Sequence, residues 1–241
     1  MSNTKYTYAV ARIRALEVSL FSDAVIEQLL ACRTADEALR FVMEKGWGDV
    51  SGDADMDAVL KREEEKTWEV IRDVAPDMKV FDVLSYPKLY HNLKAAVKEV
   101  CTEKQTPGIF YDDCDIPGGE MLRIIENREF SRLPGNMGRV AEEALDTLLH
   151  TRDGQLCDVM IDKAALEAIY EAGKRSGEPI IENYADTTVA IADIKIAVRS
   201  RKTGKSGDFM RSAMAECRSV NAEQLIRAAL SGEEEIARYL E

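Results

Sequence analysis

The sequence predicts an all-α protein made of repeated helical units. Apolar residues recur at helical spacing along nearly the whole chain, and alternating runs of β-branched residues are almost absent. In addition, one stretch occurs twice, at residues 92–104 and 101 residues later at 193–205. Five of its 13 aligned positions are identical, namely Lys94/Lys195, Ala96/Ala197, Val97/Val198, Thr102/Thr203 and Lys104/Lys205.

The register of this repeat extends beyond the repeated stretch itself. Upstream, an acidic residue followed by apolar residues occurs in both copies at the same offset, and downstream the register shifts by two residues. A two-residue insertion in a connecting loop explains that shift. We therefore predict two superposable units, about residues 52–130 and about 153–241, in which Leu93, Val97 and Val198 are buried.

The N-terminal part of the chain is expected to hold three helices. Residues 6–32 keep a helical apolar pattern, and Thr34–Glu37 form a capping box that opens the next helix. A third helix starts at Asp55 or Asp57 and stops at Pro76.

The helix that carries the first copy is expected to begin at about Pro87, and a turn follows at residues 117–119. Residues 133–138, rich in glycine and proline, form the predicted junction between two domains. These domains are residues 1–133, a helical unit with an N-terminal helical hairpin, and residues 134–241, a second helical unit.

The second domain is expected to contain helices over residues 158–173 and 185–202. The helical pattern is interrupted between them at residues 177–179, Gly-Glu-Pro. Two acidic helices are expected to close the chain.

Composition and charge exclude several classes of function. A net charge of −12 argues against nucleic-acid binding as the main role. No run approaches 18 uncharged apolar residues, so we predict no membrane span, and residues 1–6 lack the apolar core of a signal peptide. The five scattered cysteines are typical of reduced thiols in a cytosol rather than of a disulfide framework.

Basic residues recur at the same spacing in both copies. Lys94 and Lys98 lie four residues apart, and so do Lys195 and Arg199. Two interpretations stay open: a solvated face near a helix C-terminus, where cations suit the helix dipole, or a basic ridge that binds an acidic partner. These four residues are candidate partner-binding residues, together with two from the N-terminal helix, Arg12 and Arg14.

An acidic run in the chain imitates a calcium loop but lacks an essential residue. Asp53, Asp55 and Asp57 with Glu64 have the spacing, whereas Ala58 occupies the position that requires glycine. Acidic residues at a helix N-terminus explain the run without a metal.

Other candidate motifs also lack essential parts. Gly204–Ser206 resembles the end of a phosphate-binding loop, but Arg199 stands where that loop needs its first glycine. His91 and His150 are the only histidines, no cysteine pair has zinc spacing, and no G-x-S-x-G motif is present. We therefore predict no catalytic residues, no metal and no cofactor, and a protein that is not an enzyme.

Two stretches carry a resemblance to a known family. Residues 6–17, YTYAVARIRALE, resemble the opening of the C subunit of V-type and archaeal A-type ATP synthases, which is known as the d subunit in eukaryotic vacuolar ATPases. Residues 90–94, YHNLK, resemble the signature of that family, although Leu89 stands where the family usually has aspartate. The resemblance extends through nearly all 241 residues.

The resemblance implies a structural role in a rotary motor for ion or proton transport. It implies an all-helical funnel of three units around a pseudo-threefold axis, of which this sequence shows two and apparently lacks the third. Such a central-stalk subunit is a non-catalytic socket on the membrane rotor ring that receives the central shaft of the soluble head. Its implied location is cytoplasmic, peripheral at the inner face of the membrane.

Two alternatives to this interpretation stay open. A helical-repeat adaptor would bind a peptide or a helix of a partner protein in a groove. A small-molecule enzyme would have a deep pocket with convergent polar groups.

A missing third unit predicts an unpartnered face at the C-terminal end of the chain. We expect part of the apolar residues there to be exposed, so that they pair with a second copy or leave the last helix mobile. The alternative is that they pack back onto the second unit. The residues concerned are Leu225, Ile226, Ala229, Leu230, Ile236, Tyr239 and Leu240.

Overall fold

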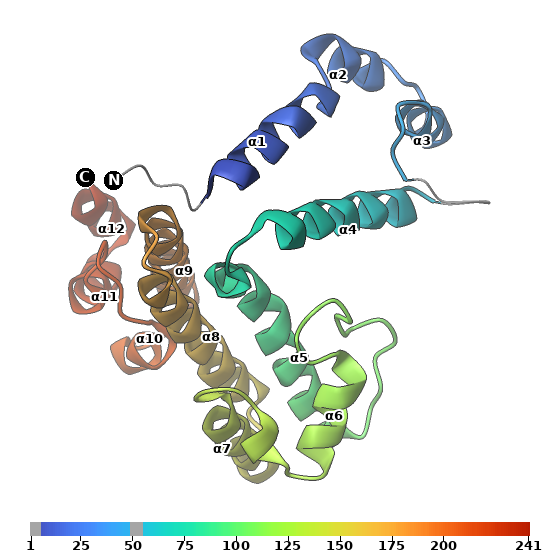
Figure 1. Ribbon diagram of the computed structural model, residues 1–241. Coiled ribbons are helices and arrows are strands. Elements are labelled where there is room, and N and C mark those ends of the chain that lie inside the picture. Colours follow the sequence, from blue (N-terminus) through green and yellow to red (C-terminus); the bar gives the residue numbers. More distant parts are fainter. Residues whose placement is uncertain (1–5, 49–54) are drawn as a thin grey trace. The chain divides into compact units, whose positions relative to one another are not determined.

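The computed structural model describes residues 6–48 and 55–241, and over these residues the fold is all-α, as predicted. The chain divides into two compact units, Met1–Met78 and Lys79–Glu241. Figure 1 colours the chain from the blue first unit to the red C-terminus. Each unit is described by itself.

The first unit consists of short helices followed by one long helix. In place of one helical run over residues 6–32, the chain is interrupted at Leu20, which has extended backbone, and a new helix begins after Ser22. The elements are α1 Thr7–Leu16, the 3₁₀ turn η2 Glu17–Ser19, α2 Asp23–Leu30, α3 Ala35–Glu44 and α4 Met56–Val74.

The first unit has a small core. Among its described residues, the buried apolar side chains are those of Val42 and Val59, and Phe21 stacks on Trp47 with ring centroids 4.9 Å apart. The Thr34 half of the predicted capping box is confirmed, because the Thr34 hydroxyl accepts a hydrogen bond from the Glu37 amide at 3.1 Å. The Glu37 side chain accepts from the amide of Arg33, one residue before the expected donor.

The second unit contains the three longest of the described helices, α5, α8 and α9. Its elements are the 3₁₀ turn η3 Met78–Phe81, α5 Asp82–Thr102, α6 Gly118–Glu126, the 3₁₀ turn η4 Phe130–Arg132, α7 Met137–Thr151, α8 Gly154–Ser176, α9 Pro179–Thr203, α10 Gly207–Ala213, α11 Ala222–Ser231 and α12 Glu233–Leu240.

The predicted start of α5 at Pro87 is wrong, because the helix begins at Asp82 and Pro87 lies inside it. Val83, in the first turn of α5, is buried against Ile169 and Ala172 of α8, and this packing favours a helix through the proline.

Helix α8 is central to the second unit, because it packs on both α5 and α9 (Figure 1). The larger core lies among α5, α6, α7 and α8, and a second core lies among α9, α10, α11 and α12. Leu133 and Met137 belong to the larger core. The predicted junction at residues 133–138 therefore lies within the second unit.

The two copies of the repeated stretch lie on α5 and α9. Leu93 and Val97 are 0% exposed, which confirms their predicted burial, whereas Val198 is only half-buried beside the second core. The duplication of whole units stays a prediction.

The expected exposed patch at the C-terminal end is wrong in its main part. Leu225, Ile226, Ala229 and Ile236 are buried, because these amphipathic helices turn their apolar faces onto α9. Leu230 and Leu240 are exposed single side chains, which are common on protein surfaces.

Candidate functional site

A buried amide on α5 fixes the loop that joins α5 to α6. The Asn92 side chain is 0% exposed and donates from Nδ2 to the carbonyl oxygens of Tyr111 at 2.7 Å and Ile116 at 3.3 Å. Its Oδ1 accepts from the Tyr111 amide at 2.9 Å. One side chain thus satisfies three backbone groups of a connection that has no helix of its own.

Two buried carboxylates on α9 hold the connection between α10 and α11. Asp186 accepts from the amides of Arg218 at 2.7 Å and Ser219 at 3.3 Å, and from the Ser219 hydroxyl. Burial by itself would raise the pKa of Asp186, but the hydrogen bonds from Ser219 and Arg218 outweigh it and lower that pKa.

Asp193, two turns further along α9, is less well satisfied. Its Oδ1 accepts from the Ala215 amide at 3.2 Å, whereas its buried Oδ2 has no hydrogen-bond partner among the described residues. Burial raises the pKa of Asp193 to about 6, although the hydrogen bond from Ala215 and the charge of Lys163 oppose that rise.

The candidate residues on α5 form partly exposed ion pairs with another helix of the same chain. The Lys94 ammonium lies 2.5 Å from Oδ1 of Asp162, and the Lys98 ammonium lies 2.8 Å from Oδ2 of Asp158. Both acids belong to α8, so this basic ridge joins α5 to α8.

The candidate residues on α9 are placed differently. Lys195 and Arg199 are exposed, and neither forms an ion pair with any residue that the structure describes. The two basic ridges are similar in sequence, but in the structure one is paired with acidic residues and the other is exposed to solvent.

The candidate residues of the first unit lie on α1. Arg14 pairs with Glu17 at 2.8 Å across one helical turn, and Arg12 is exposed. Such exposed pairs contribute little stability.

The histidines and cysteines take structural positions. Nε2 of His91 donates to the carbonyl oxygen of Ile109 at 2.8 Å, and Nδ1 of His150 donates to that of Asp146 at 2.7 Å. Burial raises the pKa of the Cys157 thiol to about 11, which does not suit a nucleophile.

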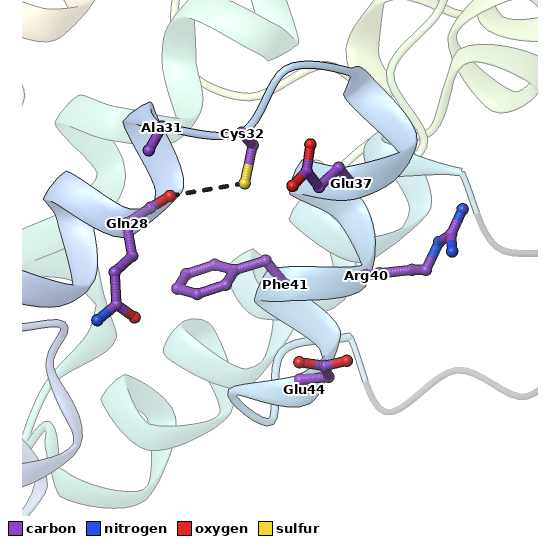
Figure 2. A pocket seen from close by; sticks show the side chains of 7 residues that line it. All are labelled: Gln28, Ala31, Cys32, Glu37, Arg40, Phe41 and Glu44. Carbon is purple, nitrogen blue, oxygen red and sulfur yellow. Dashed lines mark hydrogen bonds between the residues drawn. The ribbon is translucent and has the colours of Figure 1, made fainter.

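A pocket of about 580 Å³ lies between α2 and α3 (Figure 2). Its lining residues are Gln28, Ala31, Cys32, Glu37, Arg40, Phe41 and Glu44. The Cys32 thiol donates to the backbone oxygen of Gln28 at 3.6 Å, and one oxygen of Glu37 accepts from the Arg33 amide at 2.8 Å. Because these groups serve the local backbone, the pocket does not present an arrangement of nucleophile and base.

The acidic run that imitates a calcium loop lies only partly within the described residues. Asp53 lies outside them, whereas Asp55 caps α4 by accepting from the Ala58 amide at 2.8 Å. Within residues 6–48 and 55–241, no three His, Cys, Asp or Glu side chains are grouped so that they could hold a metal ion.

Sequence reasoning missed three of the buried polar residues, those that hold the connections described above. Asp193 lies between Ala192 and Ile194, and that placement is a signal that could have identified it, whereas Asn92 and Asp186 each have one polar neighbour in sequence.

None of the described helices is both long and apolar enough to cross a membrane. In a comparison with curated proteins, the chain is similar to the C subunit of the V-type sodium ATPase of Enterococcus hirae, with 20% identity over 217 residues. The match covers 89% of this chain and 66% of that protein, so the chain spans just under two thirds of the relative's length.

The match to a protein family is more extensive. The model of the ATP synthase (C/AC39) subunit family matches residues 9–241, which includes both copies of the repeated stretch. This chain therefore belongs to the ATP synthase (C/AC39) subunit family.

Proposed function

We propose that this protein is a non-catalytic central-stalk subunit of a V-type ATPase or ATP synthase. In this role it is the socket that couples the rotor shaft of the soluble head to the membrane rotor ring. The observation that carries the proposal is the family match over residues 9–241, supported by the similarity to the C subunit of a V-type sodium ATPase.

The helix packing of the second unit supports this proposal. Helices α5, α8 and α9 contain 21, 23 and 25 residues, which corresponds to lengths of roughly 30–38 Å. α8 contacts the other two helices through buried apolar side chains, and it is also linked to α5 by ion pairs. A close-packed helical layer has low compressibility and transmits strain, as a torque-bearing link must.

The proposed partners follow from the role. They are the central shaft subunits and the membrane rotor ring, and the proposed location is cytoplasmic, peripheral to the membrane. The candidate contact residues are those whose cationic groups are exposed, Arg12, Arg14, Lys195 and Arg199.

Copurification tests this proposal. The chain is expressed with an affinity tag at its native level, membranes are solubilised in mild detergent, and captured proteins are identified by mass spectrometry. We expect head, shaft and ring subunits of one rotary ATPase, and their loss from a Val97→Asp variant, which disrupts the core of the second unit. Capture of a soluble protein set that lacks ATPase subunits would contradict the proposal.

A helical adaptor is the second candidate function. The pocket between α2 and α3 favours it, because a peptide side chain could enter beside Phe41. An adaptor predicts that Phe41→Ala removes the captured partner, whereas a central-stalk subunit held through the second unit keeps its ATPase partners.

A further inference from the structure

One side of α9 is an exposed stripe whose first half is apolar and whose second half is basic. Residues 180, 184, 191, 195, 199 and 202 follow helical spacing, which places them on one side of the helix. Ile180 is 78% exposed, Tyr184 44% and Ile191 46%. The stripe comprises Ile180, Tyr184, Ile191, Lys195, Arg199 and Lys202, all of them exposed.

The middle of this pattern, from Tyr184 to Arg199, also occurs 101 residues earlier on α5, where its apolar part is covered. The α5 residues that match Tyr184, Ile191 and Lys195 are Val83, Tyr90 and Lys94. Val83 is 1% exposed and Tyr90 5% exposed. The pattern is thus a helix-docking face on α5 and an open face on α9.

Helix α8 shows what covers such a face. Lys94 and Lys98 pair with Asp162 and Asp158, so the order along α8 is the reverse of that along α5 and the two helices run antiparallel. Further along, apolar residues of α8 pack on Val83 and Tyr90. The covering helix therefore has two acids four residues apart, followed by an apolar face.

We propose that the α9 stripe is a docking site for an acidic amphipathic helix of a partner protein. The partner helix runs antiparallel to α9, its two acids pair with Arg199 and Lys195, and its apolar face covers Ile191 and Tyr184.

Charge selects this partner. The segment from residue 194 to residue 207 contains five cations and no acid, in a chain with a net charge of −12. On α5 an equivalent pair of cations is neutralised by α8, whereas on α9 Lys195 and Arg199 lack such a neutralising partner among the described residues. Complementary charge sets the register of the docked helix and speeds its association.

The apolar half of the stripe provides hydrophobic surface that a bound helix can bury, in addition to the charge contacts. Ile180, Tyr184 and Ile191 leave three large side chains in water on one face of one helix. Covering them removes apolar surface from water, which is the main favourable term in association. The inference is drawn from the stripe and its covered counterpart, so it stands independently of the proposed role in a rotary ATPase.

The α8 sequence itself provides a probe. A synthetic peptide of residues 154–176, with Cys157→Ser to prevent oxidation, is titrated into the full-length protein and its binding is measured by fluorescence anisotropy. We expect one binding site whose affinity falls as salt is raised. The Lys195→Glu/Arg199→Glu variant should weaken binding by at least about tenfold.

Charge exchange makes the test specific. A peptide with Asp158→Lys and Asp162→Lys should bind the native protein at least about tenfold more weakly and should bind the Lys195→Glu/Arg199→Glu variant well again. Ile191→Arg should weaken binding by a similar factor, because it places a charge in the apolar half of the stripe. The matched control, Lys104→Glu/Arg227→Glu, makes the same charge change at exposed positions outside α9, one after the end of α5 and one on α11, and should leave binding unchanged.

Three results would overturn the proposal. The first is no peptide binding at millimolar concentration, and the second is binding that neither stripe variant changes. The third is a native protein that sediments as a dimer and becomes a monomer in the Lys195→Glu/Arg199→Glu variant, because the occupant of the stripe would then be a second copy of this chain.

Discussion

Helices α5 and α9 carry similar sequences, yet their buried polar side chains are satisfied to different degrees. Asn92 and Asp193 lie 101 residues apart, both are 0% exposed, and both bind the backbone of a connection, Asn92 that between α5 and α6 and Asp193 that between α10 and α11. Asn92 bonds to backbone groups through both the oxygen and the nitrogen of its amide, whereas Oδ2 of Asp193 has no partner in the part of the chain that the structure describes. An amide thus fits its loop completely, and a carboxylate in the corresponding place leaves an unmet acceptor.

The two helices also differ in how far their polar side chains are paired within the chain. The α5 side is also joined to α8 by Lys94 and Lys98, while the corresponding cations of α9 face solvent. The polar and apolar residues of this α5 face therefore find their partners within the chain. α9 instead has a buried carboxylate whose burial is unfavourable, and a side that is exposed to solvent.

The largest expected effect comes from placing a charge in the α5 core. Val97→Asp should lower the free energy of unfolding by about 4 kcal/mol or more, because Val97 is 0% exposed and the new carboxylate has no counterion. Val198→Asp, at the half-buried position of α9, should cost less than half as much. Urea unfolding followed by circular dichroism measures both, and equal losses would remove the distinction between the two helices.

Removing the two buried polar side chains should have unequal effects. Asn92→Ala should destabilise by roughly 2–3 kcal/mol, because it leaves buried backbone groups near Tyr111 and Ile116 without partners. Asp193→Ala should cost less than about 1 kcal/mol, since it loses one hydrogen bond and also removes a buried charge. A larger loss for Asp193→Ala would reverse our interpretation.

The raised pKa of Asp193 predicts a pH-dependent effect. Its pKa of about 6 in the folded state exceeds an unfolded value of about 3.9, so the folded state binds more protons between these pH values. The stability contributed by the protonated carboxyl is therefore fully present below about pH 4 and is lost as the pH rises through about 6.

Asp193→Asn should consequently stabilise the protein by about 1–2 kcal/mol at pH 7.5 and have almost no effect at pH 4. The difference between variant and native protein cancels the titration of the other carboxylates. The same stabilisation at both pH values would show that the charge of Asp193 is not its cause.

The smallest expected effects concern the two basic ridges. Lys98→Ala should cost about 0.5 kcal/mol, because it breaks the partly exposed pair with Asp158. Lys195→Ala should change stability by less than about 0.3 kcal/mol, because that side chain forms no ion pair with a described residue. Thermal unfolding of the two variants side by side provides the comparison, and a greater loss for Lys195→Ala would contradict it.

Much of this fold could be predicted from the sequence. Helical periodicity identified most helices, and local chemistry placed the capping box at Thr34 and the break between α8 and α9 at Gly177 and Pro179. Long-range packing decided the rest. The helix through Pro87 depends on the contact of Val83 with α8, which a local pattern does not contain.

The candidate site was harder to predict for the same reason. Lys94 and Lys195 look equivalent in sequence, and only the position of Asp162 on a distant helix separates them. Likewise, the burial of Ile226 and Ile236 depends on their return to α9.

The most direct test of the central claim is a coupling measurement. The rotary ATPase of the source organism is reconstituted into sealed vesicles with and without this chain, and ATP hydrolysis and ion uptake are recorded together. We predict that without the chain the head still hydrolyses ATP but ion uptake stops, and that adding the chain restores uptake. Unchanged ion uptake per ATP in its absence would contradict the proposed coupling role.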